Sequence, residues 1–207
     1  MKLYFSPGAC SLTPNIVARE AAIPLELVRV DLGTKKIHSD GDYFAVNAKG
    51  YVPALQLEDG SVLTEVPAVV QYLADRKPDA GLVPAAGTPE RYRMQEMLGY
   101  INSELHKTYS PLFKPDTPEA TLEERKDYLR KRYAFVEAVL AKQPWLLGDH
   151  FSVADAYLFV VTNWAKAVKL DLSDFPALVA FQQRVAARPA VQAAMAAEGL
   201  IKSAKAA

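Results

Sequence analysis

Residues 1–22 read MKLYFSPGACSLTPNIVAREAA and predict a strand, a tight turn and a helix, in that order. The apolar run from Lys2 to Phe5 is typical of a strand, and Ser6-Pro7-Gly8 interrupts it. Apolar residues then recur at helical spacing, and Pro14 lies early enough to be tolerated in a first helical turn. The only cysteine, Cys10, is therefore expected at the amino end of the helix.

That position has a chemical consequence for Cys10. Unpaired backbone N–H groups and the helix dipole favour negative charge at a helix amino end. A free thiol with a pKa of about 8.5 is only about 3% thiolate at pH 7, and lowering its pKa by about two makes the thiolate the major form. The alternative is that Cys10 is a small buried apolar residue.

Composition limits the classes of function. The chain has 207 residues, half of them apolar, and 24 positive side chains balance 24 negative ones. This excludes the broad basic field expected of a protein that binds nucleic acid or an anionic membrane surface. One cysteine forms no internal disulfide, and the apolar run at residues 156–161 is far shorter than the roughly 18 residues of a membrane span. No signal peptide is recognised, so a cytoplasmic protein without a membrane segment is expected.

The remaining pattern predicts two domains. A second strand at Leu25 to Val30, a long polar loop over residues 31–50, a hairpin opened by Pro53 and a helix from Glu65 complete a mixed α/β domain at residues 1–80. A proline-rich linker follows, and the pattern from residue 88 to residue 207 is helical throughout. The fold class is α/β plus all-α. One short helix is expected near residues 42–46, and the alanine-rich tail after Pro189 is expected to fray.

This order of elements, with Val52-Pro53 before the hairpin, resembles the cytosolic glutathione transferases over nearly the whole chain. Cys10 and the segment from Glu104 to Lys107 resemble the bacterial beta class. The resemblance implies a thioredoxin-like, glutathione-binding domain followed by an all-helical domain that contributes a pocket for the electrophile, usually in a homodimer. It implies glutathione as co-substrate, with no cofactor and no metal.

Glutathione carries two carboxylates, one ammonium and one thiol, and several residues suit these groups. Val52 precedes a proline, which favours the extended backbone that pairs with a peptide, and the resemblance implies a cis Val52–Pro53 bond. Glu65 can meet the ammonium and the Val66 N–H a carboxylate, because the two residues begin a helix. Valine at 66, commonly serine in the family, keeps the N–H and loses a hydroxyl. By resemblance Lys35 holds the glycyl carboxylate, although Lys36 beside it is equally basic.

A second group of candidates lies on one predicted helix face. Gly99, Asn102, Ser103 and His106 recur at three and four residues, which predicts a polar wall beside an apolar stripe. His106, with an ordinary pKa of about 6.5, can exchange a proton with sulfur at neutral pH. The resemblance implies that His106 and Lys107 lie near the thiol, and that Glu104 reaches glutathione bound to the other subunit. Ser103 is assigned to glutathione binding on the same face.

Three side chains are candidates for handling the ligand's sulfur. Cys10 matches the class motif and either donates its S–H to the glutathione thiolate or, as a thiolate, forms a mixed disulfide. Ser11 is the alternative, because other classes of the family use a hydroxyl near this point. Tyr4 is a weaker candidate because a strand residue here is expected to pack in the core.

Ser152 and Asp155 form a capping-box pattern, in which each side chain bonds the backbone N–H of the other. Their predicted role is structural, so Asp155 is not a candidate catalytic acid.

The resemblance thus implies an enzyme of detoxification, a glutathione transferase that conjugates glutathione to hydrophobic electrophiles, with thiol–disulfide activity through Cys10. A non-catalytic protein that binds glutathione or a hydrophobic ligand is the alternative on the same fold. A dithiol oxidoreductase is disfavoured because no second cysteine follows Cys10. The electrophile pocket is expected from a set of apolar residues that are equally plausible as core: Tyr109, Pro111, Leu112, Phe113 and Trp164.

Overall fold

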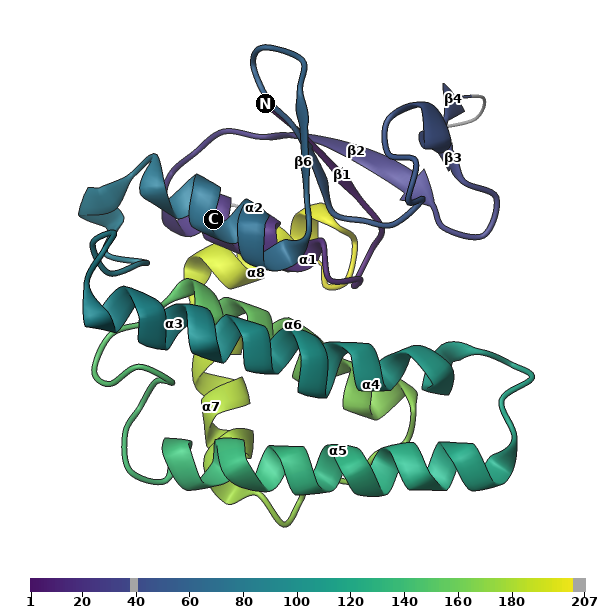
Figure 1. Ribbon diagram of the computed structural model, residues 1–207, viewed down its shortest axis with the longest axis vertical. Coiled ribbons are helices and arrows are strands. Elements are labelled where there is room, and N and C mark those ends of the chain that lie inside the picture. The colour runs from purple at the N-terminus through teal and green to yellow at the C-terminus, as the bar shows by residue number, and fades with distance from the viewer. Residues whose placement is uncertain (38–40, 203–207) are drawn as a thin grey trace. The chain divides into compact units, whose positions relative to one another are not determined.

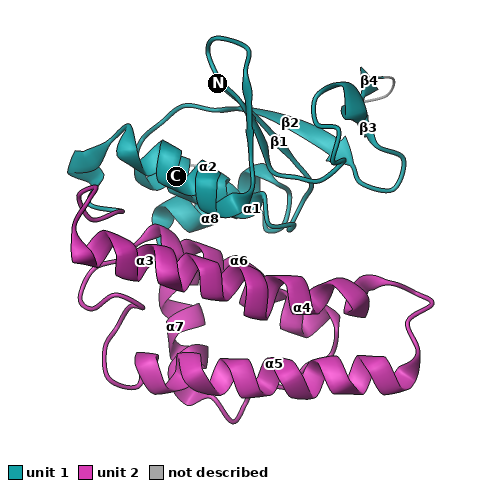
Figure 2. Ribbon diagram, viewed as in Figure 1, with its two compact units in different colours: residues 1–82, 187–207 teal, residues 83–186 magenta. Residues whose placement is uncertain are grey.

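The structure is a computed structural model that describes residues 1–37 and 41–202 (Figure 1). Its contacts divide the chain into two compact units (Figure 2). Unit 1 contains residues 1–82 and the segment from Ala187 onward, and unit 2 contains Val83–Ala186.

Unit 1 is a mixed sheet with helices. Its elements are β1 (Lys2–Phe5), α1 (Leu12–Glu20), β2 (Glu26–Asp31), β3 (Lys36–Ile37), β4 (Gly41–Asp42), β5 (Ala54–Gln56), β6 (Val62–Thr64), α2 (Val66–Asp75) and α8 (Pro189–Ala197). The strand order is β4-β3-β2-β1-β5-β6, in which β1 and β2 are parallel and the other neighbours antiparallel. The predicted strand, helix, strand unit and the hairpin are confirmed.

Strand β1 is buried on both faces of the sheet, and side-chain alternation explains how. Tyr4 lies opposite Val28 on one face, in a buried cluster that includes Tyr43. Leu3 lies opposite Leu55 on the other face, and both are fully buried. Helix α1 packs against both α2 and α8, and Figure 1 draws these three helices together beside the sheet.

The segment predicted as a long loop is more structured than expected. Its described residues contain β3, β4 and the 3₁₀ turn Tyr43–Ala45, which lies where the short helix was predicted. The Asp42 carboxylate caps this turn by accepting a hydrogen bond from the Phe44 N–H at 2.9 Å. The strands were missed because two residues are too few to show alternation.

The regular elements of unit 2 in the residues described are all helices, apart from an isolated bridge between Trp145 and Gly148. Its elements are α3 (Pro89–Tyr100), a π-helix η3 (Ile101–His106), α4 (Lys107–Tyr109), a 3₁₀ helix (Ser110–Phe113), α5 (Glu119–Leu140), α6 (Val153–Ala167) and α7 (Pro176–Ala186). Residues 153–162 of α6 are all buried, as expected of a helix that is apolar on every side. Helix α6 contacts α3, η3 and α7, so it forms the centre of unit 2.

The end of the chain corrects two predictions. Residues 88–207 do not form one domain, because α8 belongs to unit 1, where it packs on α1. The prediction that the tail after Pro189 frays is wrong for Pro189–Ala197, which is helical, and residues 203–207 lie outside the described residues. Arg188 anchors it, because Nε and Nη2 donate to the two Glu20 carboxylate oxygens at 2.6 and 2.8 Å. Alanine content alone did not reveal this contact, which joins residues 168 positions apart.

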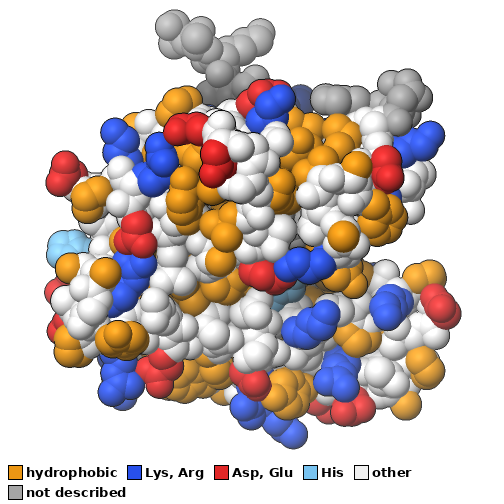
Figure 3. Space-filling model, turned by 45° about the horizontal axis from the view of Figure 1, so that its top comes forward, with side chains coloured by type: hydrophobic (Ala, Val, Ile, Leu, Met, Phe, Trp, Pro, Cys, Tyr) orange, Lys and Arg blue, Asp and Glu red, His pale blue; other side chains and the backbone are white. Residues whose placement is uncertain are grey.

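The surface agrees with the balanced charge. On the face drawn in Figure 3, acidic and basic side chains are interspersed. None of the helices within residues 1–37 and 41–202 is long and apolar enough to cross a membrane.

Candidate functional site

The turn between β1 and α1 positions Cys10. Gly8 adopts a φ of 72°, which a residue without a side chain tolerates best. The Ser11 hydroxyl accepts from the Ser6 N–H at 3.1 Å and donates to the Ser6 carbonyl at 3.3 Å, which closes the turn. The Cys10 carbonyl accepts from the Thr13 N–H in the first turn. Cys10 therefore lies at the amino end of the helix, as predicted.

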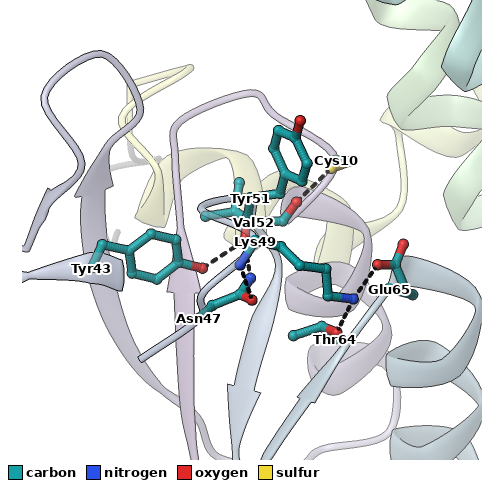
Figure 4. Close-up of polar contacts among 8 residues, drawn as sticks. All are labelled: Cys10, Tyr43, Asn47, Lys49, Tyr51, Val52, Thr64 and Glu65. Atoms are coloured by element: carbon teal, nitrogen blue, oxygen red, sulfur yellow. Dashed lines mark hydrogen bonds and ion pairs between the residues drawn. The ribbon is translucent and has the colours of Figure 1, made fainter. Parts of the chain in front are cut away.

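The electrostatic prediction for Cys10 is wrong. The thiol donates to the Val52 carbonyl, with Sγ 3.1 Å from the oxygen (Figure 4), and only 8% of the residue is exposed. Burial raises the pKa of Cys10 to about 12, and the charges of Glu65 and Glu198 act in the same direction. The helix-end N–H groups of Cys10 and Ser11 lower the pKa, but their effect is smaller. Cys10 is therefore a neutral thiol in this structure.

Ser11 and Tyr4, the other candidates for binding the ligand's sulfur, make different contacts within unit 1. Ser11 is fully buried, and its hydroxyl holds the turn at Ser6. Tyr4 packs in the core, and its hydroxyl lies 3.4 Å from Gln56 Oε1. The structure thus gives Ser11 and Tyr4 structural contacts in place of a role at sulfur.

Side chains hold the backbone just before the hairpin through hydrogen bonds to the carbonyls of Tyr51 and Val52. The Val52–Pro53 bond is cis, as the resemblance implied. The Tyr51 carbonyl accepts from the Tyr43 hydroxyl and from Asn47 Nδ2, both at 2.7 Å, and the Val52 carbonyl accepts from the thiol (Figure 4). Sequence reasoning missed Tyr43 and Asn47, because nothing in their spacing relates them to Tyr51.

Lys35 also contacts this backbone segment, at Gly50 and Tyr51. Its ammonium donates to the Gly50 carbonyl at 2.9 Å and lies 5.8 Å from the centre of the Tyr51 ring. The Lys35 backbone has a φ of 58°, an uncommon conformation for a residue with a side chain. Lys36, by contrast, belongs to β3, where it lies opposite Asp42.

The start of α2 places a backbone N–H donor next to a carboxylate. Val66 is the first residue of the helix, so its N–H has no acceptor within the helix. Glu65 has a φ of 70°, a strained conformation of the kind that clusters at functional sites. Its carboxylate accepts from Lys49 Nζ at 2.6 Å, and the same ammonium donates to Thr64 Oγ1 at 2.7 Å (Figure 4). Sequence reasoning missed Lys49, whose contact shows that this carboxylate binds a cation.

In unit 2 the predicted polar face lies on η3. His106 Nδ1 is 2.5 Å from the Tyr157 hydroxyl, which donates to Asn102 Oδ1 at 3.0 Å. The Ser103 hydroxyl donates to the Gly99 carbonyl at 3.0 Å, and Lys107 is exposed. Tyr157 was not predicted to take part, because α6 appears in the sequence as an ordinary core helix.

Glu104 has partners within its own unit. Its carboxylate accepts from the Tyr128 hydroxyl at 2.5 Å and lies 3.7 Å from Arg132 Nη1. The Tyr128 hydroxyl donates to this carboxylate, which raises the pKa of Tyr128.

The residues expected around an electrophile differ in their surroundings. Tyr109 is fully buried, and its hydroxyl pairs with that of Tyr133 at 2.9 Å, so Tyr109 is a core residue. Phe113 is half exposed, and its ring lies 5.8 Å from that of Trp164. Trp164 also contacts the His106 ring at 4.9 Å, so these aromatic side chains adjoin the polar face of η3.

The capping box is confirmed. The Asp155 carboxylate accepts from the Ser152 N–H at 2.8 Å, the Ser152 hydroxyl at 2.7 Å and the Leu146 N–H at 2.8 Å. Asp155 is fully buried. Its role is therefore to fix the start of α6 and the preceding loop, as the sequence indicated.

Glu198 is a further residue that the sequence did not reveal. Its carboxylate accepts from the Gly8 N–H at 3.0 Å and from Asn15 Nδ2 at 3.1 Å, and the residue is 6% exposed. Burial raises the pKa of Glu198 to about 7, against the effect of these two donors. The segment after α8 therefore supports the turn that carries Cys10.

Comparison with known proteins identifies relatives of both units. Family models described as the N-terminal and C-terminal domains of glutathione S-transferase match residues 8–76 and 100–189. The chain is 49% identical to glutathione S-transferase GstA of Escherichia coli O157:H7, over 97% of this chain and 100% of that protein. The ternary complex of BphK, a bacterial GST, gives a TM-score of 0.95 at 54% identity, and the beta-class enzyme of Sphingomonas chungbukensis gives 0.94 at 44%. Both structures match over 97% of this chain and 100% of their own.

Proposed function

Because this chain belongs to the glutathione S-transferase family, we propose that it conjugates glutathione to hydrophobic electrophiles. Unit 1 is the thioredoxin-like part of that fold. The proposal is carried by one observation in unit 1, the convergence of a neutral thiol, a helix start whose first N–H has no acceptor within the helix, and a cation-binding carboxylate around the backbone of residues 51–53.

The proposed contacts in unit 1 match the groups of glutathione. The Val52 backbone, presented before Pro53, pairs with the cysteinyl part of the tripeptide. The N–H of Val66 binds the γ-glutamyl carboxylate, and Glu65 binds the ammonium in the place that Lys49 Nζ occupies in this structure. Lys35 binds the glycyl carboxylate.

The reaction is a nucleophilic displacement or addition at carbon. The glutathione thiol loses its proton, the sulfur forms a bond to the electrophilic carbon, and for an aryl halide the carbon–halogen bond breaks with release of halide. Cys10 contributes as a hydrogen-bond donor: its S–H turns from the Val52 carbonyl to the glutathione sulfur and stabilises the thiolate. The raised pKa of Cys10 supports this role over that of a resident thiolate.

In unit 2 we assign roles by the family resemblance. His106 and Lys107 act on the sulfur, Ser103 and Glu104 bind glutathione, and Phe113 and Trp164 contact the electrophile. We propose that the enzyme is a homodimer, which sedimentation velocity tests directly.

The test uses Cys10→Ala and Cys10→Ser with a generic aryl halide. Loss of one weak donor to a thiolate, worth about 1 kcal/mol, predicts about a fivefold fall in kcat/KM for Cys10→Ala. Cys10→Ser retains a donor and stays close to the wild type. Retention on immobilised glutathione without turnover by the wild type would instead identify a binding protein.

Mass spectrometry after exposure to oxidised glutathione tests the mixed-disulfide activity. A neutral, buried thiol is a poor nucleophile, so the adduct at Cys10 is expected to form slowly. Rapid formation in the wild type and none in Cys10→Ala would replace the donor role by a thiol–disulfide role.

A further inference from the structure

Three polar side chains of unit 2 form a hydrogen-bonded chain. Asn102 and His106 come from η3, and Tyr157 comes from α6. The Tyr157 hydroxyl lies 2.5 Å from His106 Nδ1 and 3.0 Å from Asn102 Oδ1, so one oxygen joins the other two groups.

Helical spacing places these side chains together, because residues four apart in a helix lie on one face. The segment η3 that carries Asn102 and His106 is a π-helix. Asn102 and His106 are four residues apart and meet the same hydroxyl. Single π-helical turns occur frequently at functional sites, which is consistent with a role for this contact.

The direction of the hydrogen bonds determines the tautomer of His106. Tyrosine has one hydroxyl proton, and the Tyr157 hydroxyl donates it to Asn102 Oδ1. Its oxygen therefore accepts at the His106 side, which requires a proton on Nδ1. A neutral imidazole protonated on Nδ1 has its lone pair on Nε2.

The surrounding rings fix the orientation of the imidazole. The His106 ring meets the Trp164 ring edge-on, with 4.9 Å between centroids and 69° between planes. It meets the Tyr157 ring at 5.7 Å and 85°. Tyr157 itself is fully buried in α6, so its hydroxyl is a fixed reference point.

We propose that Tyr157 and Asn102 are positioning residues that hold neutral His106 in the Nδ1–H tautomer and make Nε2 its basic nitrogen. The assignment concerns the protein without ligand. In combination with the proposed function, on which this step rests, Nε2 of His106 takes up the proton that a thiol releases and becomes Nε2–H.

Long-range ¹H–¹⁵N correlation spectra of protein labelled at histidine test the assignment. The His106 signals are identified by their loss in His106→Gln. At a pH where the ring is neutral, the wild type is expected to show Nδ1 protonated and Nε2 unprotonated. Tyr157→Phe removes the hydroxyl and is expected to shift His106 towards the Nε2–H form that free histidine prefers.

Three further variants separate positioning from loss of structure. Tyr133→Phe removes another buried tyrosine hydroxyl of unit 2, the one paired with Tyr109, and is expected to leave the His106 tautomer unchanged. Asn102→Asp keeps an acceptor for the tyrosine proton and is expected to retain Nδ1–H, whereas Asn102→Ala is not. The signals of His150 serve as an internal reference in each spectrum.

Three results would overturn the inference: Nε2–H as the main form in the wild type, no change in Tyr157→Phe, or conversion to Nε2–H in Asn102→Asp. The first result would mean that the Asn102 amide donates and that the proton order is reversed, and the last that an acceptor at position 102 does not set the tautomer. Turnover of glutathione is measured separately. The expected tautomer without turnover would refute the proposed function and leave the inference intact.

Discussion

The carboxylate of Asp155 provides the sharpest test of how the helical unit is held together. It is fully buried and accepts from three donors, two of which are the backbone N–H groups of Ser152 and Leu146. Burial raises the pKa of Asp155 to about 6, so the group is ionised at about pH 8 and acts as an acceptor only. Removing it at that pH leaves buried donors without their acceptor.

The expected loss in the free energy of unfolding follows from the number of those donors. Each buried N–H that loses its acceptor costs about 1–3 kcal/mol, so Asp155→Ala is expected to lower the free energy of unfolding by about 4 kcal/mol. Asp155→Asn keeps one oxygen for Leu146 but turns an amide donor towards Ser152, which predicts a loss of about 2 kcal/mol. Ser152→Ala removes only the hydroxyl bond, with an expected loss of about 1 kcal/mol.

Urea unfolding at about pH 8, followed by circular dichroism, measures the series. Asp116→Ala changes an exposed acid of the same unit and is expected to stay within about 0.5 kcal/mol of the wild type. If Asp155→Ala costs no more than Ser152→Ala, the backbone donors have found other acceptors and the prediction is refuted.

Two further predictions concern unit 1. Burial raises the pKa of Glu198 to about 7. Between about pH 4.5 and 7 the folded state therefore keeps a proton that the unfolded chain has released. The free energy of unfolding falls as the pH rises through that window. Glu198→Gln should therefore become more stable relative to the wild type between about pH 5 and pH 8 in urea unfolding. Exposed Glu58→Gln should show no such trend, and a parallel trend in both variants would contradict the assignment. Lys35→Met is expected to weaken glutathione binding about tenfold by calorimetry, as loss of one charge-assisted bond implies, and Lys36→Met by less than about twofold. Equal effects would mean that these lysines act only through their charge.

The elements read from local pattern were predicted correctly. The run from Lys2 to Phe5, the interrupting Pro7 and the apolar spacing after Ser11 are all local signals, and they identified β1, the turn and α1. The capping box is equally local, because Ser152 and Asp155 are three residues apart. Features of this range depend on the nearest turn of chain and can be worked out without the tertiary structure.

The sequence could not show contacts between residues that lie far apart along the chain. Lys49 meets Glu65, Tyr157 meets His106, and Glu198 meets Gly8, at separations of 16, 51 and 190 residues. Each contact joins a predicted site residue, or the turn that carries one, to a side chain with no motif of its own. A periodicity identifies the face on which a residue lies, but the partner on the opposing element is set by packing.

The prediction for Cys10 failed because burial changes its pKa more than the helix end does. Its placement at the helix start was correct, and the N–H groups there do lower the pKa. A helix end stabilises a charge by about 0.3–1 kcal/mol, or up to about 2 kcal/mol in favourable geometries. A pKa of about 12, about three above the ordinary value for cysteine, corresponds to about 4 kcal/mol against the anion, so burial outweighs the dipole. A negative charge on Cys10 therefore requires that its bond to Val52 opens and that solvent or a ligand replaces it, whereas a hydrogen bond from its neutral thiol requires only a rotation about the Cβ–Sγ bond.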